Sequence, residues 1–140
     1  MAKTTPEQNK ALVLEAFDTL FNKRDYETAA RFWSPTYIQH SAHIPPGRDG
    51  LFSLVKALPR ELRYESALTT ANGDYVMLHG RFSGIGQPVN WIVVDIVRVE
   101  NGRLAEHWDV VQPLPEADYD PLRPSIENLD RFRAVFGITD

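Results

Sequence analysis

The stretch from residue 63 to residue 112 constrains the fold most, because turn signals divide it into short extended segments. The sequences Asn72-Gly73-Asp74 and Asn101-Gly102 are typical of tight turns between neighbouring antiparallel strands. A third break, rich in glycine, lies at residues 84–88. The segments between these breaks are rich in valine, isoleucine and aromatic residues. The pattern therefore predicts an antiparallel meander with strands at about 63–71, 75–83, 89–100 and 103–112.

Helical patterns precede this meander. Thr5 and Gln8 form a capping box that opens the first helix, and Asp25 can cap a second one. Apolar residues recur at helical spacing in both segments and again in a third. Pro35 and Pro59 are expected to end the second and third helices. The predictions are helices from residue 5 to about 21, from 25 to 34 and from 49 to 58, with a short strand at 36–40 between the last two.

This order of elements predicts an α+β fold in which the helices pack on one side of a curved antiparallel sheet. The short strand at 36–40 can join the sheet. A curved sheet folded over a long helix leaves an internal cavity, where a small ligand would bind. The length of 140 residues fits a single domain at 1–140, with its sheet and helices at about 5–112. The extension at 113–140 begins with several prolines and is expected to end in a short helix at 126–136.

Composition narrows the functional class. The chain has no cysteine, which excludes disulfides, thiolate catalysis and cysteine-ligated zinc. Its formal net charge of -4 argues against nucleic acid as a partner. No apolar run approaches the roughly 20 residues of a membrane span, so no membrane partner is expected. The first residues lack the apolar core of a signal peptide, which favours a cytoplasmic location.

The last predicted strand carries the most informative polar residues. His107 and Asp109 are two positions apart, so they share one face of the strand, with their Cα atoms about 7 Å from each other. A histidine and a carboxylate in this arrangement are suited to acid–base chemistry. Two plainer interpretations stay open at this point: an exposed polar face of the sheet, or a structural ion pair.

Other ionisable residues lie among apolar neighbours. Asp95 shares a strand face with Trp91, where a carboxylate is costly unless it is paired or protonated. It is either a functional group or a buried hydrogen-bond partner. A single strand histidine such as His79 is more typical of a structural role. His40 and His43 could ligate a metal, but no third ligand follows at a diagnostic spacing, so no metal site is predicted.

The chain resembles a known family in four segments that occur in the expected order. They are YIQH at 37–40, PGRDG at 46–50, VDIVRVENG at 94–102 and EHWDVVQ at 106–112. Together they resemble SnoaL-like polyketide cyclases, which belong to the superfamily of nuclear transport factor two. The likeness extends from about residue 5 to residue 112. It is fairly specific for the fold and much less specific for the activity.

The resemblance implies a cone-shaped, cystatin-like fold in which a curved antiparallel sheet wraps three N-terminal helices around a pocket. Cyclases of this family perform an intramolecular aldol condensation without a metal or organic cofactor, and an aspartate is their general acid/base. That role falls to Asp109. His107 would orient or assist it, and His40 would be a further catalytic residue. The side chains expected to line the pocket are Tyr37, His79, Trp91 and Asp95.

These observations predict a cofactor-independent enzyme that performs acid–base chemistry on a small apolar carbonyl compound. The resemblance also implies a homodimer formed through the outer face of the sheet. Three alternatives remain at this stage. The first is an enzyme like ketosteroid isomerase or a hydratase, which would use the same carboxylate. The second is a non-catalytic binding protein, and the third is an interaction module with an exposed apolar patch.

Overall fold

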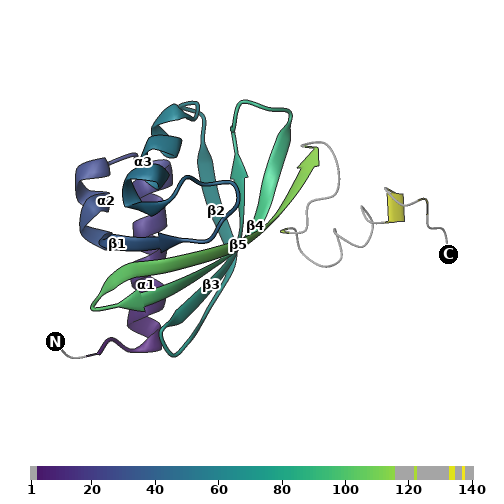
Figure 1. The fold of residues 1–140 in the computed structure, drawn as a ribbon. Helices are drawn as coiled ribbons and strands as arrows, with labels where there is room; N and C mark the ends of the chain where they lie inside the picture. Colours follow the sequence, from purple (N-terminus) through teal and green to yellow (C-terminus); the bar gives the residue numbers. More distant parts are fainter. Residues whose placement is uncertain (1–2, 116–121, 123–132, 135–136, 138–140) are drawn as a thin grey trace.

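A computed structural model of the chain describes residues 3–115, 122, 133–134 and 137. The helix predicted at 126–136 falls outside the described residues except for 133–134. Helices and strands follow each other in the predicted order (Figure 1). The helices are α1 (Pro6–Phe17), α2 (Tyr26–Phe32) and α3 (Gly47–Ala57), and a π-helical segment, η1 (Asp18–Asn22), continues α1. The strands are β1 (Trp33–Gln39), β2 (Arg63–Asn72), β3 (Tyr75–Ser83), β4 (Val89–Glu100) and β5 (Arg103–Pro115).

The strands form one mixed sheet in the order β1-β5-β4-β3-β2. Strands β2 to β5 are the predicted antiparallel meander, and β1 joins the edge of the sheet parallel to β5. The sheet curves, and the helices gather on one side of it (Figure 1). The predicted α+β architecture is confirmed. Among the described residues, no helix is both long enough and apolar enough to cross a lipid bilayer.

Two predicted boundaries were wrong, and both involve proline. Strand β1 begins at Trp33, so Pro35 lies inside a strand instead of ending a helix. Strand β5 continues past residue 112 and pairs Pro113 with Trp91 and Pro115 with Val89. A proline cannot donate to a strand ladder, so it is tolerated where one side of the strand is free. β1 is an edge strand, and it pairs with β5 only up to His107, which leaves the far end of β5 with a free side.

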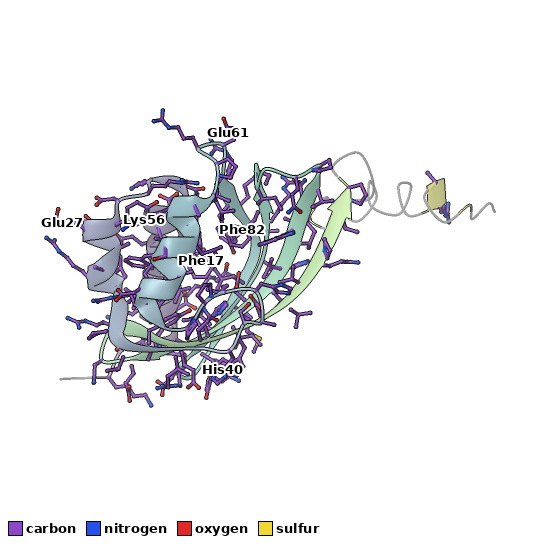
Figure 2. All side chains as sticks on the ribbon, turned by 45° about the horizontal axis from the view of Figure 1, so that its top comes forward. Phe17, Glu27, His40, Lys56, Glu61 and Phe82 are labelled. Carbon is purple, nitrogen blue, oxygen red and sulfur yellow. The ribbon has the colours of Figure 1, made fainter. Side chains whose placement is uncertain are left out.

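Aromatic side chains fill the space between the helices and the concave face of the sheet. The ring of Phe17 lies 5.2 Å from that of Phe21, 5.2 Å from that of Tyr64 and 6.3 Å from that of Trp33, measured between centroids. Figure 2 shows Phe17 and Phe82 between the helices and the sheet. Each large apolar side chain buried in this way stabilises the fold by about 1.5–3 kcal/mol. This packing holds α1 and η1 against the sheet and fixes one wall of the cavity described below.

The side chain of Asn22 anchors the π-helical segment to the edge strand β2. Its amide nitrogen donates to the backbone oxygen of Tyr64 at 3.0 Å, and its amide oxygen accepts from the Tyr64 backbone N–H at 2.7 Å. The amide thus replaces a neighbouring strand at this position. Because Phe21 lies in the same segment, the two bonds also fix where its ring enters the cavity wall.

Candidate active site

The concave face of the sheet and the helices enclose a cavity of about 60 Å³. Its lining is almost entirely aliphatic and aromatic, with contributions from α1, η1, α3 and every strand except β2. The polar exceptions are Tyr37, His43, Asp95, His107 and Asp109. Ligand pockets commonly measure about 300 Å³ or more, so a larger ligand has to move some of the lining side chains apart. The site is therefore an apolar cavity with a few polar groups.

A β-bulge in β5 determines which side chains of this strand reach the cavity. Val99 pairs with Leu104, but the next pair joins Arg98 to Glu106, so Ala105 has no partner of its own. Strict alternation along this strand predicts that Leu104 shares a face with Glu106, and the bulge makes this prediction wrong. The bulge turns Leu104 inward, three residues before His107, and both line the cavity. Regular alternation resumes after the bulge.

Asp95, His107 and Asp109 meet at one place in the cavity wall. Asp95 and Asp109 are direct partners across β4 and β5, and His107 lies opposite Val97, the next inward position on β4. The Nε2 atom of His107 is 2.6 Å from Oδ1 of Asp95. One ring nitrogen of His107 and one carboxylate oxygen of each aspartate all lie within 4.8 Å of one another. Asp95 and His107 are each only 4% exposed, and Asp109 is half-buried.

Burial raises the pKa of the Asp95 carboxyl above its usual value. The hydrogen bond and the charge of His107 act in the opposite direction, whereas the negative charge of Asp109 raises the Asp95 pKa further. The second oxygen, Oδ2, is buried and has no hydrogen-bond partner among the described residues. The pair formed by Asp95 and His107 is thus built to hold a proton, and Asp95 keeps one free acceptor atom.

Gln39 and Tyr37 extend this network along β1. Oε1 of Gln39 is 2.6 Å from Nδ1 of His107 and accepts from the backbone N–H of Ser41 at 3.0 Å. Nε2 of Gln39 donates to the hydroxyl of Tyr37 at 3.0 Å. Burial raises the pKa of Tyr37, so its hydroxyl stays protonated and can donate. Gln39 was missed from the sequence, although it shares a strand face with Tyr37.

Asp95, His107 and Asp109 are also the donor set that a metal would use, since each offers one ligand atom. Two atoms bound to one zinc ion at about 2.0–2.1 Å lie roughly 3 Å apart. The separation of 2.6 Å between Nε2 of His107 and Oδ1 of Asp95 is shorter and corresponds to a hydrogen bond. As arranged, the three residues suit a shared proton better than a bound cation. The absence of a metal cofactor stays a prediction.

His40 lies outside the cavity. Its Nε2 atom is 2.7 Å from Oε2 of Glu106, and its ring stacks on Trp108 with the centroids 4.9 Å apart. Figure 2 shows it at the margin of the molecule, away from Phe17 and Phe82. The physical reason is strand alternation. Tyr37 and Gln39 point inward, so Ile38 and His40 point outward. The structure thus does not bring His40 to the position expected from the resemblance.

His79 is also placed outside the cavity. On β3, the inward side chains are Val76 and Leu78, both fully buried. His79 lies on the opposite face, between Met77, which is exposed, and Arg81, which is half-buried. Tyr37, Trp91 and Asp95 do line the cavity, as expected for pocket residues. His43 lines it too, with its ring 6.2 Å from that of Trp91.

Comparison with known proteins identifies the family. The sequence model of the SnoaL-like polyketide cyclases matches residues 11–116. The chain therefore belongs to the SnoaL-like polyketide cyclase family. No curated protein matches the sequence.

Solved structures share the fold. AclR, a proposed hydroxylase from Streptomyces galilaeus, is 28% identical, with 77% of this chain and 91% of AclR covered and a TM-score of 0.63. A proposed ketosteroid isomerase from Kribbella flavida is 24% identical, with 91% of both chains covered and a TM-score of 0.67. A protein from Cytophaga hutchinsonii described as NTF2-like and of unknown function is 14% identical, with 79% of this chain and 93% of that chain covered and a TM-score of 0.65. The last two likenesses concern the fold alone.

Proposed function

We propose that this protein transfers a proton at the carbon beside the carbonyl group of a small apolar compound, as in an aldol condensation or cyclisation. The observation that carries the proposal is the convergence of Asp95, His107 and Asp109, whose ligand atoms lie within 4.8 Å of one another in an apolar cavity. Carboxylates in such surroundings have the altered proton affinity that general acid–base catalysis needs.

The two aspartates are suited to different tasks because their surroundings differ. Asp95 is fully enclosed, and its raised pKa favours the protonated carboxyl, which shares its proton with His107. Asp109 is half-buried, so it can act as the base that removes the proton from carbon. Two neighbouring carboxylates in different surroundings can divide the roles of acid and base in this way.

The proposed reaction begins when Asp109 takes a proton from the carbon beside the carbonyl. The electron pair of the broken C–H bond passes to the carbonyl oxygen and forms an enolate. The Tyr37 hydroxyl, which stays protonated, is the donor that would stabilise this oxygen. The enolate carbon then attacks a second carbonyl of the same molecule, and the new alkoxide takes the proton back from Asp109. No atom or electron is needed beyond those of the substrate and Asp109.

Two related functions use the same residues. In an isomerase, Asp109 would return the proton to a different carbon instead of leaving the enolate to attack a carbonyl. In a binding protein, the polar groups would only orient a ligand. An experiment that follows proton exchange and binding separately distinguishes catalysis from simple binding.

The test uses 2-tetralone, a flat apolar ketone, in D₂O. Proton NMR follows the replacement of its hydrogens beside the carbonyl by deuterium, and the fluorescence of Trp33 and Trp91, which line the cavity, reports binding. We expect the protein to bind the ketone and to accelerate the exchange above the rate in buffer. Binding without acceleration would favour the non-catalytic role. If neither is observed, the cavity does not take this class of compound.

We also propose that two copies of the chain pair through the outer face of the sheet. Direct strand partners point to the same side, and the ladder joins Leu68 to His79, His79 to Val94, and Val94 to Val110. The exposed large apolar residues of this sheet face, called the outer patch here, are Ile38, Leu68, Tyr75, Met77 and Val110. Exposed apolar side chains gathered on one sheet face are typical of a protein interface, and a second copy supplies a matching surface.

A further inference from the structure

The carboxamide of Gln39 lies at the centre of the hydrogen-bond network of the candidate site, although an amide does not titrate as the aspartates and His107 do. It contacts the imidazole of His107, the backbone of Ser41 and the hydroxyl of Tyr37. The two ends of the amide are not equivalent, because its nitrogen only donates hydrogen bonds and its oxygen only accepts them. The identity of the neighbours therefore decides which way the amide must point.

The backbone N–H of Ser41 fixes this orientation. A peptide N–H is always a donor, and it lies 3.0 Å from Oε1 of Gln39. A flipped amide would place its NH₂ group against this N–H and leave two donors facing each other. The observed orientation also lets Nε2 of Gln39 donate to Tyr37 at 3.0 Å. The Tyr37 hydroxyl can donate or accept and so fits either orientation, which leaves the Ser41 N–H as the contact that selects the arrangement of the amide.

This orientation determines the protonation of one nitrogen of His107. Oε1 of Gln39 can only accept, and it lies 2.6 Å from Nδ1 of His107, so Nδ1 must carry a hydrogen. The other nitrogen, Nε2, then faces Oδ1 of Asp95 at 2.6 Å. Any proton that the imidazole exchanges with Asp95 has to travel along this second contact.

We propose that Gln39 is the positioning residue of the site, because it holds His107 in the form protonated on Nδ1 and so directs its exchangeable proton at Nε2 toward Asp95. The consequence for catalysis rests on the proposed function, whereas the state of the imidazole does not. Gln39 acts through His107 and need not touch the substrate. Its role resembles that of any hydrogen-bond acceptor that selects a histidine tautomer.

Two substitutions of similar length separate the acceptor from the rest of the side chain. Gln39→Glu keeps an oxygen for Nδ1–H and for the Ser41 N–H. Gln39→Met fills the same space and offers no acceptor of comparable strength. In Gln39→Met, a hydrogen on Nδ1 has no acceptor, so we expect the neutral imidazole to carry its hydrogen on Nε2. Asp95 then gives up its proton and accepts this hydrogen bond as a carboxylate.

The experiment is NMR of the full chain labelled with ¹⁵N in its histidines, at pH 7. Couplings between the ring nitrogens and ring hydrogens show which nitrogen is protonated, and a His107→Gln sample identifies the His107 signals among the four histidines. We expect a hydrogen on Nδ1 of His107 in the wild type and in Gln39→Glu, and its loss from Nδ1 in Gln39→Met. Circular dichroism checks that each variant is folded.

A bare Nδ1 in the wild type would overturn the proposal, and so would an unchanged pattern in a folded Gln39→Met. If Gln39→Met does not fold, the wild type and Gln39→Glu still decide, because both must carry the hydrogen on Nδ1. The readout needs no substrate. The expected pattern would therefore support the role of Gln39 even if 2-tetralone showed no exchange, which would count only against the proposed function.

Discussion

Asp95 on β4 and Asp109 on β5 are direct partners across an antiparallel pair of strands. Like charges placed opposite each other in this way destabilise a sheet, and the cost grows when one of them is buried. His107 reduces the cost by sharing a proton with Asp95 at 2.6 Å. Clusters of this type, in which burial and a charged neighbour act on one carboxyl, are characteristic of sites that perform acid–base chemistry.

The raised pKa of Asp95 predicts how its replacement changes stability with pH. A carboxyl whose pKa is higher in the folded state than the unfolded value of 3.8 adds stability below that value, and this is lost as the pH rises toward the folded pKa. Asp95→Asn cannot ionise and still places an amide beside His107. The free energy of unfolding of Asp95→Asn, relative to that of the wild type, should therefore rise as the pH increases above 3.8. The rise is up to about 1.4 kcal/mol per pH unit while Asp95 keeps its proton in the wild type.

Urea unfolding between pH 4 and pH 8 measures this difference. Asp49→Asn is the matched control because Asp49 is exposed, and its curve should stay parallel to that of the wild type. A loss of several kcal/mol in Asp95→Asn at neutral pH would instead mean that an ionised Asp95 stabilises the fold as the partner of a charged His107.

Gly80 predicts a stability effect in the wall next to the cavity. A Cβ atom at this position would lie 2.5 Å from the hydroxyl of Tyr64 and 2.7 Å from the backbone oxygen of Glu65. Gly80→Ala should therefore lower the free energy of unfolding by about 1–3 kcal/mol. The Tyr64 hydroxyl is buried without a hydrogen-bond partner among the described residues, so Tyr64→Phe alone should cost little.

A double-mutant cycle of these two substitutions tests the steric explanation. Because Tyr64→Phe removes the closest atom, it should recover part of the stability that Gly80→Ala loses. The contacts with the ring carbon Cζ of residue 64 and with the Glu65 backbone account for the remainder. Strictly additive losses would show that the clash with Tyr64 is not the cause.

The outer patch predicts the oligomeric state. Val110 is 68% exposed in the single chain, and a lysine there would place a charge inside the proposed interface between two copies. We expect the wild type to be a dimer in analytical ultracentrifugation and Val110→Lys to dissociate at least ten times more readily. Gln87→Lys adds the same charge to an exposed loop and should leave the dimer intact. A monomeric wild type would refute the pairing.

Much of the fold was predictable because its signals are local. Capping residues such as Thr5 and the turn at Asn101 and Gly102 determine where elements begin and end, and the structure has them as expected. Alternation likewise grouped His107 with Asp109. The bulge at Ala105 was not predictable, because it depends on how two strands pair and not on the sequence of either one.

The site was less predictable, because alternation shows which residues share a face but not which face is buried. His40 and Tyr37 lie three positions apart on β1 and its extension, so only one of them could point into the cavity. Gln39 escaped notice since an amide on a strand has no distinctive pattern of its own. Its importance arises from contacts with His107, which is 68 positions away in the chain.

The central claim is that Asp109 is the base of a proton-transfer site, and the rate of deuterium exchange into 2-tetralone tests it most directly. Asp109→Asn keeps the shape of the side chain and removes the base, so the rate should fall by roughly two orders of magnitude or more. His79→Gln alters a histidine outside the cavity and should keep the wild-type rate. A folded Asp109→Asn protein that exchanges as fast as the wild type would contradict the account.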